Sequence, residues 1–185
     1  MRLLRISLIL LFVAVNTTTY AAQATCPTAL SHTVKTLVDN KPVNLCKTYL
    51  GQVVLIVNTA SKCAYTYQYE ELEAVYDRYK SQGLVVLGFP SNDFASQEPG
   101  TEKNIRNFCR LTYGVQFPMF SKSRVTADNP VPLYETLGKL SGEFPRWNFH
   151  KYLINRQGDL VGSYASHVEP NDKQLVSKIK ELLKK

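Results

Sequence analysis

The feature that most constrains the fold is an apolar run, Val53–Val57, followed directly by a polar segment that ends in a cysteine, Asn58–Cys63. Five consecutive apolar and mostly β-branched residues predict a strand that is buried on both faces. Apolar residues then recur at helical spacing over residues 72–79. The sequence therefore places Cys63 in the turn between the end of a buried strand and an amphipathic helix.

This position suits a functional cysteine. In open α/β sheets, sites form at the carboxyl ends of the strands. The first N–H groups of a helix lack internal partners, and their partial positive charge favours a thiolate, which is the nucleophilic form of cysteine. The alternative is that Cys63 is a buried structural residue.

The N-terminus has the composition of a signal peptide. Arg2 and Arg5 precede a ten-residue apolar run, Ile6–Val15, and small residues follow it. The run is too short to span a bilayer, which takes about 20 residues. We therefore expect a signal peptide over 1–21, with cleavage between 21 and 24, and one domain over 22–185. The mature protein is expected to be exported, to the periplasm if the source is bacterial and otherwise by secretion.

The composition favours one ordinary globular domain without stable membrane insertion. Hydrophobic residues make up 44% and charged residues 20% of the 185 residues. Losing the two arginines of 1–21 lowers the formal net charge from +7 to +5. No run of five basic residues exists, so we interpret this charge as a solvated surface and expect no nucleic-acid partner.

Four cysteines remain after residue 21, namely Cys26, Cys46, Cys63 and Cys109. Four cysteines allow three connectivities, and the sequence alone does not choose between them. Cys26 and Cys46 flank a predicted hairpin over residues 32–45, with an Asn-containing turn. In an oxidising compartment, a disulfide between them would tie the N-terminus to the body, so we favour it over two unrelated thiols.

The rest of the chain alternates strands and helices. A second buried strand is expected over 84–89, and Thr101 is a plausible N-cap for a helix over 102–111. Further expected elements are a short strand over 117–120, a helix over 133–140, a hairpin of 147–154 with 160–164, and a last helix opened by Pro170. This order indicates an α/β fold with a central mixed sheet flanked by helices and an antiparallel edge.

Three segments carry a resemblance to a known family: Asn58–Thr66, Phe89–Gly100 and Trp147–Lys151. In this order and spacing the chain resembles the glutathione peroxidase family in its cysteine-containing form, from about residue 30 onward. The resemblance implies a thioredoxin-like fold and reduction of hydrogen peroxide and of organic and lipid hydroperoxides. It implies no cofactor and no metal.

The resemblance also implies a catalytic set of Cys63, Gln97, Trp147 and Asn148. Attack of the thiolate on a peroxide produces a sulfenic acid and a departing oxygen that needs hydrogen-bond donors. Two side-chain amides and an indole N–H are such donors at neutral pH. Taken singly, these three residues also fit a solvated loop, a core aromatic and a turn.

Cys109, 46 positions after Cys63, resembles the resolving cysteine of thioredoxin-dependent members. Its helix would have to open locally to bring the two sulfurs together. The segment between Leu140 and Trp147 is short, whereas tetrameric glutathione-using members carry an extra loop there. We therefore expect a monomer reduced by a thioredoxin-like dithiol protein rather than by glutathione. The chain departs from the family pattern at Ala64 and over Ser91–Ala95.

Two other classes of protein fit parts of the pattern. A thiol–disulfide exchange or redox-sensing protein of the same fold would normally carry a second cysteine at position 66, where Thr66 stands. A copper-binding or structural module would need clustered ligands, and His32, His150 and His167 show no metal-ligand spacing. Peroxide turnover separates these classes.

Overall fold

The computed structural model describes residues 25–184; the expected signal peptide, 1–21, lies outside the described residues. A four-stranded mixed sheet forms the centre, in the order β4 (Leu84–Pro90), β3 (Val53–Thr59), β5 (Lys151–Ile154) and β6 (Leu160–Tyr164). β3 pairs in parallel with β4 and antiparallel with β5, and β5 pairs antiparallel with β6. Every residue of β3 and β4 is buried, as the apolar runs predict.

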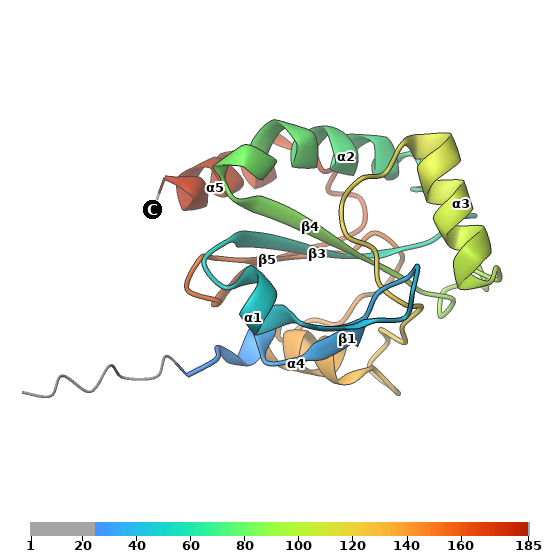
Figure 1. Cartoon of the computed structure of the whole chain (residues 1–185), viewed down its shortest axis with the longest axis horizontal. Coiled ribbons are helices and arrows are strands. Elements are labelled where there is room, and N and C mark those ends of the chain that lie inside the picture. The colour runs from blue at the N-terminus through green and yellow to red at the C-terminus, as the bar shows by residue number, and fades with distance from the viewer. Residues whose placement is uncertain (1–24, 185) are drawn as a thin grey trace, which may run out of the picture.

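Helices cover both faces of this sheet, as Figure 1 shows. α2 (Gln68–Tyr79) and α5 (Lys173–Leu183) lie on one face, and α1 (Leu45–Tyr49) and α4 (Pro132–Ser141) on the other. Because successive side chains of a strand point to opposite faces, Leu55 and Val57 join the core under α2 and α5. Ile56 joins the second core, under α1 and α4. This is the thioredoxin-like arrangement that the resemblance implies.

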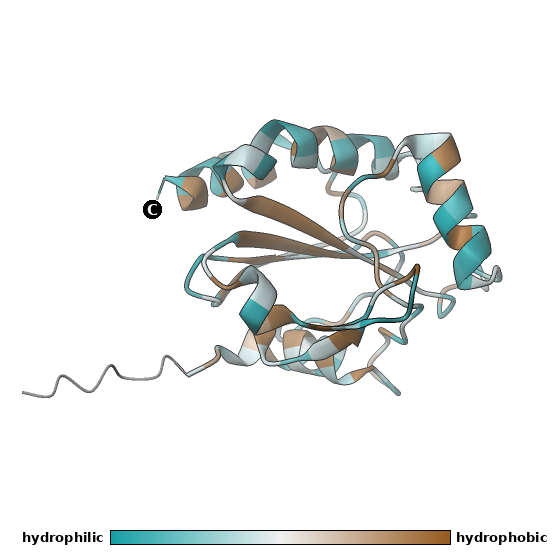
Figure 2. Ribbon diagram, in the orientation of Figure 1, coloured by the Kyte–Doolittle hydropathy of each residue, from teal (hydrophilic) through white to brown (hydrophobic). Residues whose placement is uncertain are grey.

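Two further parts complete the fold. β1 (Thr33–Lys35) and β2 (Pro42–Asn44) form the predicted N-terminal hairpin, preceded by the short helix η1 (Thr28–Leu30). α3 (Glu102–Tyr113) stands at one end of the sheet, and its surface alternates between polar and apolar stripes in Figure 2. A short helix, η2 (Lys80–Gln82), leads from α2 into β4.

Three sequence-based boundaries were wrong. The expected strand over 117–120 is reduced to isolated bridges, in a segment where Pro118 has no N–H to donate. Residues 147–150 precede β5 rather than belong to it, because Phe149 adopts a positive φ of 65° that a strand does not accommodate. α5 begins at Lys173, because the Asp172 side chain accepts hydrogen bonds from the N–H groups of residues 174 and 175 and caps the helix there.

The sequence analysis also missed α1, which is five residues long and begins directly after the hairpin. Asn44 caps it by accepting a hydrogen bond from the Lys47 N–H at 2.9 Å. Across residues 25–184, no helix combines the length and the hydropathy that a membrane crossing requires.

Candidate active site

Cys63 lies in a tight turn after β3 and is 8% exposed. The turn is held by Thr66, whose hydroxyl accepts the Cys63 N–H at 2.9 Å and donates to the Cys63 carbonyl at 2.7 Å. The Tyr65 N–H donates to the Cys63 sulfur at 3.4 Å. α2 begins only at Gln68, so the N–H group on the sulfur comes from the turn and not from the first residues of the helix. The sequence analysis used Thr66 only to exclude a second cysteine and missed this role.

Gln97 and Asn148 meet beside this turn. The Asn148 side chain donates from Nδ2 to the Gln97 Oε1 at 3.0 Å. The Gln97 carbonyl accepts the N–H of Lys62, the residue before Cys63, at 3.0 Å. Residues 51 positions apart are thereby joined to each other and to the cysteine turn. The Asn148 Oδ1 is buried and has no hydrogen-bond partner within the described part of the chain.

Asn58 at the end of β3 holds the segment that carries Trp147 and Asn148. Its side chain donates to the Trp147 carbonyl at 3.1 Å and accepts the His150 N–H at 3.0 Å. The Trp147 ring packs against Phe94, with ring centroids 5.7 Å apart, and is 37% exposed. The sequence analysis named Asn58 within a motif but missed this role; the available signal was a polar residue directly after the apolar run Val53–Val57.

The two loops that supply the amides contain strained backbone. Ala95 and Ser96, just before Gln97, have φ of 49° and 52°, and Phe149, just after Asn148, has φ of 65°. Residues with a Cβ disfavour this left-handed region, at a cost of about 1–2 kcal/mol each. The surrounding hydrogen bonds therefore hold both loops in conformations that the isolated segments would avoid.

Lys151 is a fully buried charge that the sequence analysis did not identify. Its ammonium donates to the Phe149 carbonyl and to the Gln68 Oε1, both at 2.7 Å. Gln68 is the first residue of α2, so Lys151 connects the helix after the cysteine turn to the loop that carries Asn148. Burial lowers the pKa of Lys151 to about 7, although Glu71 and Glu169 favour its charged form.

Cys109 lies on α3, is 1% exposed and belongs to the same apolar core as Cys63. Both thiols are free. Burial raises the pKa of Cys109 to about 11, so the thiol is protonated at neutral pH. The Tyr69 hydroxyl beside it is buried and forms no hydrogen bond of good geometry. In the closed helix, the Cys109 thiol is therefore both buried and protonated.

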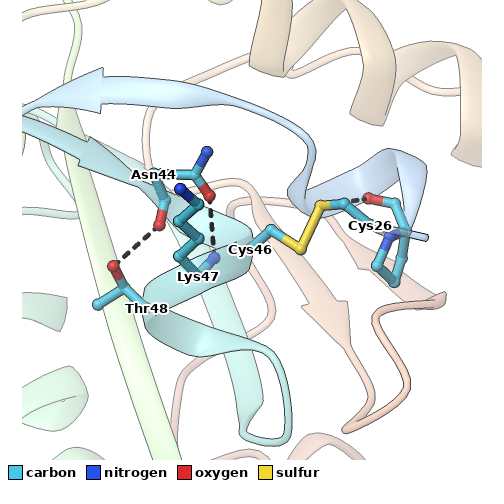
Figure 3. The surroundings of a disulfide bond; sticks show 6 residues. Cys26, Asn44, Cys46, Lys47 and Thr48 are labelled. Carbon is cyan, nitrogen blue, oxygen red and sulfur yellow. Dashed lines mark hydrogen bonds between the residues drawn. A yellow bond between two sulfur atoms is a disulfide. The ribbon is translucent and has the colours of Figure 1, made fainter. Parts of the chain in front are cut away.

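Cys26 and Cys46 form a disulfide, the pairing that the sequence analysis favoured. Their Cα atoms are 6.0 Å apart and the bond joins residues 20 positions apart. Figure 3 shows the bond beside the Asn44 cap at the start of α1. It therefore links the first described residues to the helix that follows the hairpin, and Cys46 packs against the second core whereas both free thiols belong to the first.

The predicted site residues Cys63, Gln97, Trp147 and Asn148 thus gather around the end of β3, while Cys109 lies on a separate helix. Over residues 25–184, no group of three His, Cys, Asp or Glu side chains is placed to hold a metal ion. A buried cysteine in a turn of the thioredoxin-like fold, with amides from two other loops beside it, defines the class of thiol-based peroxidases.

Comparison with known proteins identifies the family. A family model described as glutathione peroxidase matches residues 30–138, and the chain belongs to this family. It is 48% identical over 124 residues to the glutathione peroxidase-like peroxiredoxin gpx1 of Schizosaccharomyces pombe, an alignment covering 65% of this chain and 78% of that protein. It is 43% identical over 155 residues to the hydroperoxy fatty acid reductase gpx1 of Synechocystis, covering 78% and 90%. The crystal structure of Trgpx in apo form superposes with a TM-score of 0.68 at 37% identity, covering 85% of this chain and 97% of that one.

Proposed function

We propose that Cys63 is the residue that reduces hydroperoxides. Its thiolate attacks the distal oxygen of the O–O bond; the S–O bond forms, the O–O bond breaks, and the departing alkoxide takes a proton to leave as an alcohol. Cys63 is oxidised to a sulfenic acid. The observation that carries the proposal is the chain of hydrogen bonds from the cysteine turn through Gln97 to Asn148.

Gln97, Trp147 and Asn148 stabilise the charge on the departing oxygen. Preorganised donors at such a position are worth far more than the same groups in water, because they need no reorganisation during the reaction. With its Oε1 accepting from Asn148, the Gln97 amide keeps its N–H groups for the substrate.

Cys109 resolves the sulfenic acid after α3 opens locally. The Cys109 thiol attacks Cys63, a disulfide forms and water leaves. In the closed helix Cys109 is buried and its pKa is about 11; exposure returns the thiol toward its ordinary pKa of about 8.5 and raises its thiolate fraction. Of the residues of α3, only Ile105 and Cys109 are fully buried, and Phe108 and Tyr113 pack against the core from partly buried positions, so local opening has to break a limited set of apolar contacts.

The substrates and the reductant follow from the relatives and from the site. The exposed Trp147 ring, backed by the buried Phe94, presents an apolar surface beside the amides, which suits organic and lipid hydroperoxides as well as hydrogen peroxide. The name of the Synechocystis relative, a hydroperoxy fatty acid reductase, supports this range. A thioredoxin-like dithiol protein reduces the Cys63–Cys109 disulfide, and the enzyme acts as a monomer. The composition of residues 1–21 supports export, to the periplasm of a bacterium or by secretion.

Turnover of the purified protein tests the proposal, with thioredoxin and glutathione supplied in parallel as reductants. Cys63→Ser should fold normally and lose turnover by orders of magnitude. Cys109→Ser should still consume about one equivalent of peroxide and then stop, which mass spectrometry detects as a sulfenic or sulfinic acid on Cys63. Substantial turnover in folded Cys63→Ser would disprove the assignment, and normal thioredoxin-supported turnover in Cys109→Ser would disprove the resolving step.

A further inference from the structure

A cavity of about 600 Å³ opens beside α3, and Cys109 contributes to its lining from the buried side of the helix. It lies between the tip of the β1–β2 hairpin, α3 and the segment over residues 115–120. Its walls are largely apolar and include Val38, Val43, Cys109, Leu111, Phe117 and Met119. Cys63 does not line it. We call this cavity the α3 groove.

The rim of the α3 groove exposes apolar side chains. Leu111 is 85% exposed and Val38 is 65% exposed, which is unusual for large aliphatic residues on both sides of one depression. A ligand that covered them would remove this apolar surface from water, at about 25 cal/mol per Å². The volume of the groove falls within the range of about 300–1,000 Å³ typical of small-molecule sites.

Two arginines give the α3 groove a positive end. Arg106 and Arg110 line it and are four residues apart on α3, so both lie on one face of the helix. Their hydrogen bonds go to neutral acceptors: Arg106 to the Asn107 Oδ1, and Arg110 to the Val115 carbonyl and the Gln116 Oε1. Within residues 25–184, neither guanidinium forms an ion pair.

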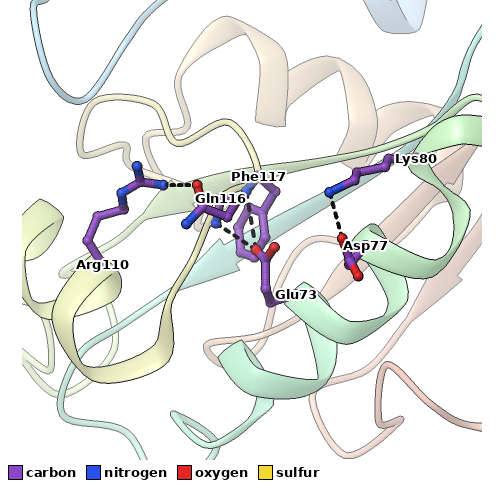
Figure 4. A network of polar contacts seen from close by, with 6 residues as sticks. All are labelled: Glu73, Asp77, Lys80, Arg110, Gln116 and Phe117. Carbon is purple, nitrogen blue, oxygen red and sulfur yellow. Dashed lines mark hydrogen bonds and ion pairs between the residues drawn. The ribbon is translucent and has the colours of Figure 1, made fainter.

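The nearest carboxylates do not neutralise these arginines. Asp39 on the hairpin is the one carboxylate among the residues that line the groove, and it pairs with Lys41 at 2.6 Å. Glu73 on α2 accepts the backbone N–H groups of Gln116 and Phe117, as Figure 4 shows beside the contact of Arg110 with Gln116. The groove therefore combines an apolar wall with two guanidinium groups that no carboxylate engages.

We propose that the α3 groove binds an aliphatic carboxylate of the fatty-acid class. The alkyl chain lies against the apolar wall between Val38 and Leu111, and the carboxylate pairs with Arg106 and Arg110, whose planar donors match a carboxylate. A neutral apolar ligand would form no ion pair with the two arginines, and a small anion would not remove the apolar wall from water.

Binding at this groove regulates the peroxidase, a consequence that rests on the proposed function. Cys109 and α3 form one wall, and the hairpin and residues 115–120 form the others, so a ligand that spans them binds the closed helix and not the opened one. A ligand that binds only one state reduces the population of the other by the factor 1 + [L]/Kd. At a concentration of about 100 Kd, formation of the Cys63–Cys109 disulfide should slow about 100-fold, while the reaction of Cys63 with peroxide is unchanged.

Calorimetry on the reduced protein tests binding without any assay of activity. The probe is sodium dodecanoate below its micelle-forming concentration, with dodecanol as the neutral analogue. We expect one saturable site for dodecanoate, weakened at least about tenfold by the double substitution Arg106→Ala with Arg110→Ala. Lys180→Ala, which removes an exposed charge from α5 on another part of the molecule, should leave binding unchanged. Dodecanol should bind the wild type and the double variant equally.

Rapid-mixing experiments then test the regulatory consequence. With saturating dodecanoate, oxidation of Cys63 by one equivalent of peroxide should proceed at its normal rate and the following disulfide step should slow. Absence of saturable binding, or equal binding by the double variant, would overturn the site whether or not the enzyme is a peroxidase. Binding with an unchanged disulfide step would overturn the regulation and leave the site in place. Circular dichroism of each variant with and without ligand controls for unfolding by the amphiphile.

Discussion

Removing the N-terminal cap of α3 is expected to accelerate formation of the Cys63–Cys109 disulfide in the proposed peroxidase cycle. The Thr101 hydroxyl accepts a hydrogen bond from the Asn104 N–H at 3.3 Å and so caps the helix. Thr101→Ala removes this bond and leaves the Asn104 N–H, in the first turn of α3, without its side-chain acceptor. If Cys109 reaches Cys63 only from the opened helix, a less stable helix supplies the reacting state more often.

The size of the effect follows from the cap and from the packing of the helix. Loss of a Thr cap typically costs about 1 kcal/mol, within a range of about 0.5–2. α3 has two fully buried residues, Ile105 and Cys109, and two partly buried ones that pack against the core, Phe108 and Tyr113, so we expect the loss to be expressed mostly as local opening of this helix. An energy of about 1 kcal/mol multiplies the population of the opened helix about fivefold, so disulfide formation should accelerate by about that factor.

The assay is rapid mixing with one equivalent of peroxide, followed by acid quenching and mass spectrometry to separate sulfenic acid from disulfide. Trp147, the one tryptophan of the chain, supplies a parallel fluorescence signal from the site. Two matched variants serve as controls. Thr101→Ser retains a hydroxyl cap and should resolve at the wild-type rate. Asp172→Ala removes the corresponding cap from α5, which does not carry Cys109, and should also resolve at the wild-type rate.

Hydrogen exchange of the amides over residues 105–109 shows whether Thr101→Ala has opened the helix. Faster exchange together with an unchanged or slower disulfide step would refute the reasoning, because the opened helix would then not be the reacting state. Equal acceleration in Asp172→Ala would also refute it, since the effect would come from general destabilisation.

Three further outcomes are expected. The pKa of Lys151 is about 7 in the fold and lies below its unfolded value, so the unfolded state binds more protons in the range between them. Between pH 7 and about 10, the free energy of unfolding of the wild type should therefore rise by about 1.4 kcal/mol per pH unit relative to that of Lys151→Met. If denaturation gives the same pH dependence of this free energy for both proteins, the argument from burial is wrong. Gln97→Ala should slow peroxide oxidation about 100- to 1,000-fold in stopped-flow and leave the disulfide step unchanged; oxidation at the normal rate would make Gln97 structural. Cys46→Ser should lose about 3 kcal/mol of stability under non-reducing conditions, as expected for a closed loop of this length, and keep its peroxide reaction; peptide mapping that finds Cys26 bonded to another cysteine in the wild type would contradict the pairing.

The sheet was predictable from the sequence because its central strands are marked by one simple pattern. Val53–Val57 and Leu84–Phe89 are apolar throughout, and both are buried on both faces in the fold. Helix boundaries depend on single side chains and backbone angles, which a periodic pattern does not record. The Asp172 cap moved the start of helix α5, and the positive φ of Phe149 moved the start of strand β5, each by several residues.

The residues of the candidate site were predictable in type but not in their connections. Gln97 and Asn148 were identified from motifs, whereas the bond between them joins loops 51 positions apart. The sequence did not mark Lys151 as a buried charge, because a lysine at the start of a strand is usually solvated. Its role is apparent only once Gln68 and the Phe149 carbonyl are seen to accept from it.

The bond between Cys26 and Cys46 sets a condition on any reductant of this protein. One molecule holds a formed disulfide and two free thiols, and in the proposed cycle these two thiols pass between free and bonded states. A reductant that acted on sulfur without discrimination would open the N-terminal bond as well as the catalytic one, at a cost to stability of about 3 kcal/mol. Reducing strength alone is therefore a poor criterion for the natural electron donor. Selectivity must then come from binding: we expect the natural donor to contact the surface around Cys63 and Cys109 and not the Cys26–Cys46 bond at the other end of the hairpin.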